Sequence, residues 1–242
     1  SVYVMRVERR DGVSQLTLAH ITPTGTEELA VLEVASAPPH VPDVADFRLL
    51  ADGGSSVNHM PAICVIGSGG DIVLMPVDEE ASAPAEVVGS VDQGILAAAW
   101  SPEEDVLVLI TGGEKRLIVM TREFEVMSET MLSTEAFGDD QPVNVGWGSK
   151  STQFHGSEGK QAAMAAANAP EESDPRGPLV PEDDGLPRIS WRGDGAFFVT
   201  SSAEASNDAV HRILRTYTRT GTLSATSDRS VRGISHVLSL IH

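Results

Sequence analysis

Apolar residues along this chain come in short runs separated by turn residues, without the spacing of a long amphipathic helix. Runs at 62–66 and 72–75 flank the turn sequence Gly-Ser-Gly-Gly-Asp, and runs at 106–111 and 117–120 flank Gly-Gly-Glu-Lys. Glycine tolerates the positive φ angles that tight hairpin turns require. The pattern therefore predicts a series of antiparallel hairpins and an all-β fold.

Further strands follow from the same pattern of apolar runs and turns. We expect a hairpin of 2–7 and 14–21 as the tail of an earlier unit, and an inner strand at 47–50. A third hairpin pairs 197–201 with 212–217 across a longer loop at 203–209. Outer strands are expected near 124–127 and 222–225.

The tryptophans Trp100, Trp147 and Trp191 are 47 and 44 residues apart, and each follows a short run of small or apolar residues. Periods of about 40–50 residues with this order of strands are typical of propeller blades. The alternative is chance spacing within another all-β fold. We predict an all-β, WD-repeat-type β-propeller. Because strand-like sequence reaches both chain ends, residues 1–242 are expected to be one propeller fragment, truncated at both ends.

One long stretch breaks this rhythm. Residues 164–185 are rich in alanine, proline and acidic side chains, which predicts a disordered acidic loop with little to bury. The blade that begins at Trp147 is then degenerate, with one strand near 152–155. A second proline-rich stretch, 35–46, is expected to cross between blades.

The composition narrows the classes of partner. The chain has 17 Lys and Arg against 35 Asp and Glu, a net charge of −18 that disfavours direct contact with phosphate backbones. The single cysteine, Cys64, excludes an intramolecular disulfide and a cysteine-based zinc cluster. No apolar stretch approaches the roughly 20 residues that span a membrane, so no membrane partner is expected.

No motif for catalysis, cofactor binding or metal binding stands out. The seven histidines include no pair at the i, i+4 spacing of a helical metal site. The run Gly156–Lys160 lacks the spacing of a phosphate-binding loop, and there is no Gly-x-Ser-x-Gly nucleophile elbow. We therefore predict no catalytic, cofactor-binding or metal residues, no cofactor and no enzyme activity.

The most specific run is 143–163, Val-Asn-Val-Gly-Trp-Gly-Ser-Lys-Ser-Thr-Gln-Phe-His-Gly-Ser-Glu-Gly-Lys-Gln-Ala-Ala. It resembles a signature stretch in the propeller region of the largest subunit of the Elongator complex. Similar sequence surrounds Trp100 and Trp191, so the resemblance covers about 62–227. Within the run we assign partner contact or blade closure to Trp147, Phe154, His155, Glu158 and Lys160. The alternatives are that the run only plugs a degenerate blade and that His155 is an ordinary strand-end histidine.

The resemblance implies that residues 1–242 are a single N-terminal β-propeller fragment of a longer parent, and it implies a function as well as a fold. In that family the large subunit scaffolds a catalytic subunit, of radical-SAM and acetyltransferase type, that builds a carboxymethyl group on the wobble uridine of tRNA. This chain would be a non-catalytic scaffold that contacts the catalytic subunit and a second propeller subunit, and tRNA only indirectly or weakly. The full-length parent would be a homodimer through a C-terminal part absent here. The resemblance also implies a location in the cytoplasm, with the nucleus as a second compartment.

Two other functions remain open from the residues alone. The first is a generic WD-repeat adaptor of another multiprotein assembly, which different partners would reveal. The second is a propeller hydrolase, which would show turnover by the isolated chain.

Overall fold

The computed structural model describes residues 2–10, 12–50, 61–77, 84–132, 183–206 and 209–227. Within them the chain forms fifteen β-strands and no helix, which confirms the predicted all-β class. The strands are β1 (Val2–Arg10), β2 (Val13–Thr22), β3 (Gly25–Ala35), β4 (Val44–Leu50), β5 (Ala62–Gly67), β6 (Asp71–Pro76), β7 (Glu86–Ser90), β8 (Ile95–Trp100), β9 (Val106–Thr111), β10 (Arg116–Thr121), β11 (Val126–Met131), β12 (Arg188–Trp191), β13 (Phe197–Ser206), β14 (Ala209–Thr218) and β15 (Leu223–Thr226).

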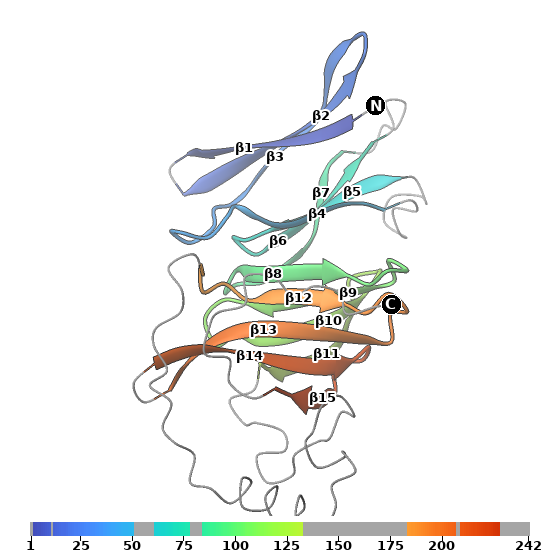
Figure 1. The fold of residues 1–242 in the computed structure, drawn as a ribbon. Helices are drawn as coiled ribbons and strands as arrows, with labels where there is room; N and C mark the ends of the chain where they lie inside the picture. The colour runs from blue at the N-terminus through green and yellow to red at the C-terminus, as the bar shows by residue number, and fades with distance from the viewer. Residues whose placement is uncertain are drawn as a thin grey trace, which may run out of the picture.

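The strands form four antiparallel sheets in chain order, β1–β3, β4–β7, β8–β11 and β12–β15. Each of the last three is a four-stranded meander whose first and last strands are its edges. Figure 1 shows the sheets stacked face to face, like successive blades. The first strands β4, β8 and β12 lie together, with β8 in contact with both of the others. This arrangement is that of propeller blades whose inner strands line a common axis.

An apolar cluster fills each space between neighbouring sheets. Leu16 and Leu18 of the first sheet pack against β5 and β6. Trp100 lies in the cluster between the second and third sheets, and Trp191 in the cluster between the third and fourth. Because the two middle sheets are covered on both faces, every residue of β5 and β9 is buried. This burial explains why these strands are continuous apolar runs instead of alternating ones.

Polar contacts join the third and fourth sheets at the end where the inner strands β8 and β12 finish. The indole nitrogen of Trp191 donates a hydrogen bond to the carbonyl oxygen of Ala99 at 3.2 Å. Arg219, in the turn between β14 and β15, forms an ion pair with Asp105 of the neighbouring sheet. Because hydrogen bonds and ion pairs are directional, these contacts fix how the fourth sheet is oriented against the third, which apolar packing alone does not do.

The structure differs from the sequence prediction in several elements. The prediction of a loop at 203–209 is wrong, because β13 and β14 pair as far as Ser206 and Ala209. The strands β3 and β7 were not predicted, and β11 begins two residues later than expected. The blade expected at Trp147 lies outside the described residues, and the described sheets β8–β11 and β12–β15 share one core.

Candidate functional site

The site residues predicted from the sequence lie outside the described residues. This applies to the whole signature run and to its five candidates, Trp147, Phe154, His155, Glu158 and Lys160. The predicted acidic loop is also outside, except for Asp183, Asp184 and Gly185 at its end. The structure therefore bears on these predictions through the two points where the chain leaves and re-enters the described part.

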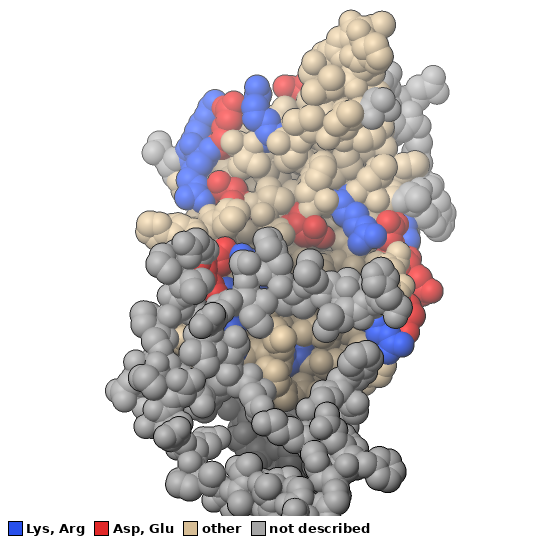
Figure 2. All heavy atoms as spheres, viewed as in Figure 1, with Lys and Arg blue, Asp and Glu red and all other residues tan. Residues whose placement is uncertain are grey.

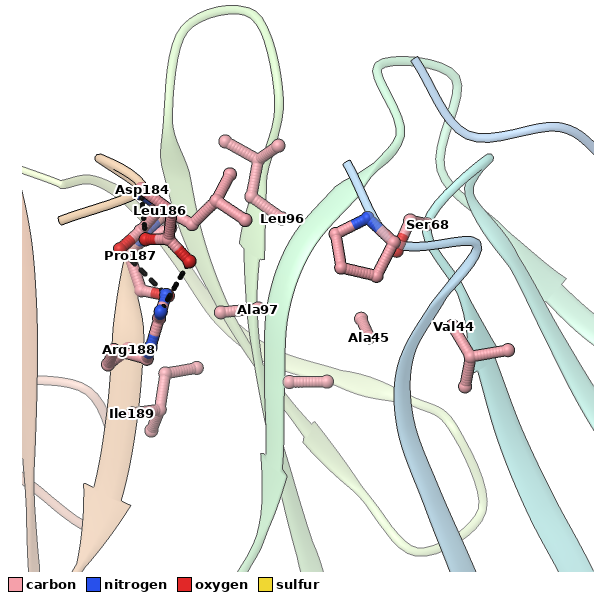
Figure 3. A pocket seen from close by; sticks show the side chains of 12 residues that line it. Val44, Ala45, Ser68, Leu96, Ala97, Asp184, Leu186, Pro187, Arg188 and Ile189 are labelled. Atoms are coloured by element: carbon pink, nitrogen blue, oxygen red, sulfur yellow. Dashed lines mark hydrogen bonds and ion pairs between the residues drawn. The ribbon is translucent and has the colours of Figure 1, made fainter. Parts of the chain in front are cut away.

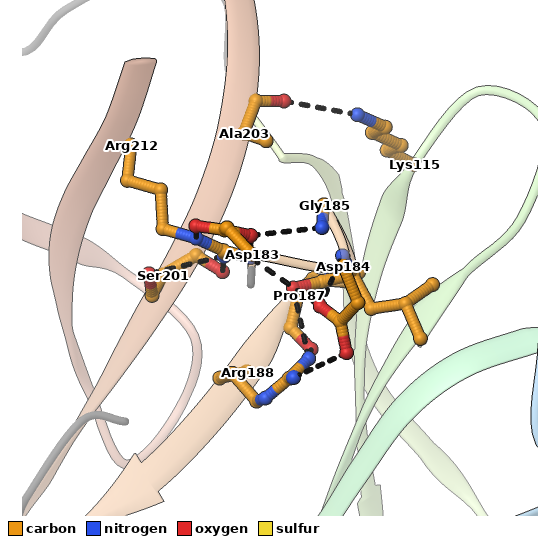
Figure 4. A network of polar contacts seen from close by, with 10 residues as sticks. Lys115, Asp183, Asp184, Gly185, Pro187, Arg188, Ser201, Ala203 and Arg212 are labelled. Carbon is orange, nitrogen blue, oxygen red and sulfur yellow. Dashed lines mark hydrogen bonds and ion pairs between the residues drawn. The ribbon is translucent and has the colours of Figure 1, made fainter. Parts of the chain in front are cut away.

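The two ends of the connection 133–182 lie close together on one end of the stack. On the leaving side, the amide of Leu132 donates to the carbonyl oxygen of Lys115 at 2.8 Å. The ammonium group of Lys115 donates to the carbonyl oxygen of Ala203 at 3.2 Å. Ala203 is the register partner of Arg212, which binds Asp183 on the returning side (Figure 4). The chain therefore leaves the described part at Leu132 and re-enters it at Asp183 on the same face of the stack.

Asp183 is fixed by a buried ion pair with Arg212. The two guanidinium nitrogens Nε and Nη2 donate to the two carboxylate oxygens at 2.6 and 2.5 Å, a bidentate geometry. Both side chains are only 1% exposed. The hydrogen bond from Arg212 is the main reason that the pKa of Asp183 lies below its usual range, with the amide of Gly185 adding to the effect.

The next residue, Asp184, organises the turn that leads into β12. Its carboxylate accepts the amide of Leu186 at 2.9 Å and a guanidinium nitrogen of Arg188 at 2.6 Å. Arg188 also donates to the carbonyl oxygens of Leu186 and Pro187. Burial opposes ionisation of Asp184, but these donors outweigh it, and the pKa of the carboxyl is lowered. Arg212 also lies 3.6 Å from this carboxylate, so Asp184, although its side chain is 47% exposed, is already paired with two arginines.

A cavity of about 240 Å³ lies beside this turn, where the three inner strands start (Figure 3). Its walls are mostly apolar and come from β4, β8 and the turn before β12. The lining residues are Pro42, Val44, Ala45, Ser68, Leu96, Ala97, Ala98, Asp184, Leu186, Pro187, Arg188 and Ile189. The cavity is therefore at the axis end of the blades and on the face where the chain re-enters the described part at Asp183 and Asp184.

One polar group of this cavity has no partner. Ser68, in the turn between β5 and β6, is 1% exposed, and its hydroxyl makes no hydrogen bond in the structure. Its backbone groups do have partners, because the amide donates to the carbonyl oxygen of Asp43 and the carbonyl oxygen accepts the amide of Ile95. A buried hydroxyl without a partner costs about 1–3 kcal/mol. The hydroxyl oxygen itself is buried, so it lies beside the cavity without facing an occupant.

The described residues offer no constellation for catalysis. No group of three His, Cys, Asp or Glu side chains within them could hold a metal ion. Burial is the main cause of a raised pKa at Cys64, so in this part of the chain its thiol is protonated and a poor nucleophile. The described part of the chain contains no helix that could span a membrane.

On the face drawn in Figure 2, the described part of the chain shows no single field of positive charge. Figure 2 shows basic and acidic side chains side by side on the face in view. The densest group of arginines, on β1, is paired with acids: Arg6 and Arg10 with Glu8, and Arg9 with Asp43. These three arginines share two acids, so most of their positive charge is balanced and they are a weak platform for a phosphate backbone.

Sequence reasoning missed Asp183, Asp184, Arg188 and Arg212. The acids were assigned to a disordered loop because their neighbours are polar and rich in proline. The signal that was available is Arg212, a charged residue in a strand with apolar neighbours, which needs a buried acid as its partner.

The sequence model of the family described as "ELP1 first N-terminal beta-propeller" matches residues 4–240. Elongator complex protein 1 from Mus musculus is 38% identical over 178 residues, which cover 74% of this chain and 12% of that protein. The protein of the same name from Drosophila melanogaster is 40% identical over 172 residues, covering 70% of this chain and 13% of that protein. The chain thus spans about an eighth of the length of these relatives.

Among solved structures, the crystal structure of Chaetomium thermophilum Sqt1 has a TM-score of 0.45 and 5% sequence identity, covering 89% of this chain and 43% of Sqt1. That similarity is too weak to support an argument about function. The family model matches nearly the whole chain, and the stack of four-stranded meanders is the architecture that its description names. The chain therefore belongs to the Elongator complex protein 1 family, within the first N-terminal β-propeller of that family.

Proposed function

We propose that this chain is a non-catalytic scaffold propeller of the Elongator complex. The observation that supports this most directly is the family match over residues 4–240. The stacked sheets add a physical reason, because a rigid stack offers loops and rims for partner contact without covalent chemistry. Its role would be to hold the catalytic subunit and a second propeller subunit in register.

The proposed contact face is the one where the connection 133–182 begins and ends. The Asp183–Arg212 pair and the Lys115–Ala203 hydrogen bond anchor both sides of that connection to the sheets. We assign partner contact to the signature run, and in particular to Phe154, His155 and Lys160. With a net charge of −18, the propeller would attract a basic partner, an effect that increases association rate and orientation more than affinity.

In this proposal the chemistry belongs to another subunit. The propeller would support carboxymethyl-type modification of the tRNA wobble uridine only by positioning the catalytic subunit. Contact with tRNA would be indirect or weak, which agrees with the mixed charges on the described surface. The parent protein would dimerise through a C-terminal part and work in the cytoplasm, with a nuclear pool as a further expectation.

Affinity purification of the tagged full-length parent from its native cells, followed by mass spectrometry, tests the proposal. We expect a radical-SAM acetyltransferase-like subunit and a second propeller subunit to co-purify. Recovery of coat proteins or cullins instead would favour the generic adaptor and overturn the assignment. Turnover of a substrate by the isolated chain would contradict the non-catalytic role.

Variants of the signature run separate partner contact from blade plugging. The parent carrying Phe154→Ala and Lys160→Ala should lose co-purifying subunits while its unfolding temperature stays unchanged. The matched control is Arg192→Ala, in an exposed turn at the other end of the blade. A lower unfolding temperature with full subunit recovery would assign the run to blade plugging.

A further inference from the structure

Strand β11 is the most exposed outer strand of the three four-stranded sheets. It stands at the end of the order β11–β10–β9–β8, so one side of its backbone faces away from the sheet. Five of the six residues of β11 are exposed, against three of five on β7 and none on β15, the outer strands of the neighbouring sheets. An open edge of this kind is a template for pairing with another strand.

The backbone of β11 has donors and acceptors available for a further strand. The amide of Leu132, directly after β11, donates to the carbonyl oxygen of Lys115 at 2.8 Å on the side of β10. Because the backbone groups of an antiparallel strand alternate in direction, the N–H and C=O groups of Glu129 and Met131 point to the opposite side. An added strand can therefore bond to both residues without disturbing the ladder between β10 and β11.

The side chains on one face of this edge are an apolar pair with an acid between them. Val126 is 58% exposed and Met131 is 52% exposed. Their register partners, and that of Glu129, are alternate residues of β10, so the three side chains share one face. That face continues the apolar layer of Ile118 and Met120 in the core between the second and third sheets. Apolar side chains of an added strand beside Val126 and Met131 would extend this layer.

The charge around β11 is negative after its ion pairs are counted. Four acids stand against two arginines in β11, the turn before it and its ion pairs, a net charge of −2: Glu114, Glu123, Glu125, Glu129, Arg116 and Arg122. Arg116 is shared between Glu114 and Glu129, so it balances only one of them. Lys115 is directed instead to the carbonyl oxygen of Ala203 in the fourth sheet. A basic side chain is therefore the complementary neighbour of Glu129.

We propose that the outer edge of β11 binds an extended segment of a partner subunit as an added antiparallel strand. Every second residue of the segment would be apolar, basic and apolar, opposite Val126, Glu129 and Met131. Main-chain hydrogen bonds to Glu129 and Met131 would give affinity, and the three side chains would give specificity. This inference rests on the proposed function in taking the partner to be a subunit of the complex, but the edge itself is defined by residues of this chain.

Titration of the isotope-labelled 242-residue chain with acetyl-Thr-Val-Thr-Lys-Thr-Val-Thr-amide, followed by amide NMR shifts, tests the edge directly. We expect saturable shifts at Ser128, Glu129 and Thr130. A matched peptide with glutamate in place of lysine should bind about threefold more weakly. Tighter binding of the glutamate peptide, or shifts confined to other strands, would overturn the proposal.

Methylated peptides distinguish strand addition from general apolar binding. The lysine of the peptide lies opposite Glu129, so its amide faces β11 and N-methylation of the lysine should abolish binding. N-methylation of either threonine next to the lysine should leave binding unchanged, because those amides face away from β11. Equal binding of the two kinds of methylated peptide would contradict strand addition.

Variants at exposed positions test the side chains of the edge. The double variant Val126→Lys and Met131→Lys should weaken peptide binding by at least about tenfold, because lysines replace both apolar contacts and repel the lysine of the peptide. The matched control is Val87→Lys, at a 45% exposed position on β7, which should leave binding unchanged. The unfolding temperature of each variant shows that it is folded. Equal affinity of the folded double variant and the control would overturn the proposal.

Purification of the complex separates this inference from the proposed function. The wild-type parent tests the function through the subunits that it recovers, whereas the peptide titration tests the edge without them. Lower recovery of a subunit with Val126→Lys and Met131→Lys, but not with Val87→Lys, would support a partner strand on β11. Full recovery with all of these substitutions would leave the scaffold function standing and refute β11 as a subunit contact.

Discussion

Replacing Asp183 with asparagine should strongly destabilise the fourth sheet. The substitution preserves the shape of the side chain but removes the negative charge opposite Arg212. Arg212 is 1% exposed, so its guanidinium group would stay buried with only the more distant carboxylate of Asp184, at 3.6 Å, as a counter-charge. One of its two short contacts, at 2.5 and 2.6 Å, would also face an amide NH₂ group, which cannot accept.

The size of the effect follows from the burial of the pair. Breaking a buried ion pair by removing one partner costs about 3–5 kcal/mol, whereas an exposed pair is worth up to about 1 kcal/mol. Arg212 retains its longer contacts to Ser201 at 3.4 Å, which replace little of the lost charge interaction. We therefore expect Asp183→Asn to lower the free energy of unfolding by about 3 kcal/mol. The exposed pair of Arg192 and Asp194 provides the control, and Asp194→Asn should cost less than about 1 kcal/mol.

Urea unfolding of the 242-residue chain, followed by tryptophan fluorescence and far-UV circular dichroism, measures both changes. A double-mutant cycle with Arg212→Met isolates the pair. The double variant should be more stable than either single variant, because it leaves no unpaired buried charge. Coincident fluorescence and dichroism transitions would show that the sheets unfold together.

The pH dependence provides an independent check of the same pair. The pKa of Asp183 is lowered in the folded state, so the unfolded chain binds a proton first as the solution is acidified. The stabilisation is fully present above about pH 4, the ordinary aspartate pKa, and is lost as the pH falls through the lowered value. Asp183→Asn should remove this part of the acid sensitivity. Two results would refute the reasoning. One is a decrease in the free energy of unfolding below about 1 kcal/mol for Asp183→Asn at neutral pH. The other is an unchanged loss of stability of this variant at acidic pH.

Three other predictions test packing and reactivity in the described part. Gly69→Ala should cost about 2 kcal/mol, since a Cβ there meets the backbone of Ala35, whereas Gly25→Ala meets open space and should cost less than about 0.5 kcal/mol in urea unfolding. Trp191→Phe should cost at least about 1 kcal/mol in the same assay through its lost indole hydrogen bond, and an unchanged midpoint would contradict that bond. Cys64, fully buried, should react with a thiol reagent only as fast as the sheet opens, so rapid labelling of the folded chain would disprove its burial.

The sequence predicted the sheets better than it predicted the site. Strands β5, β6 and β9 were found within a residue or two, because burial on both faces makes them continuous apolar runs bounded by glycine turns. Strand β3 was missed, since its exposed face carries acids and only its other face packs against the second sheet. The hairpin β13–β14 was shortened for a similar reason, because its far end is polar.

The candidate site depends on contacts between segments far apart in sequence. Strands β12 and β13 lie between Asp183 and Arg212 in the sequence, and nothing in the sequence near either residue specifies that the two form a pair. The cavity likewise joins residues from three blades, and its orphan hydroxyl on Ser68 is known only once the surroundings are placed. Local patterns predict which elements form, but the pairing of buried charges is set by the packing of whole sheets.

The lengths of the connections between sheets bear on the role of the signature run. The chain passes from β7 to β8 through 91–94 and from β3 to β4 through 36–43. Both connections join neighbouring sheets that share a core. The connection from β11 to β12 also joins two sheets that share a core. A short connection would therefore suffice between β11 and β12 as well, yet 132–187 separates them. Joining neighbouring sheets does not account for this length, and we propose that the connection, whose ends are tied to Lys115 and Arg212, serves partner contact.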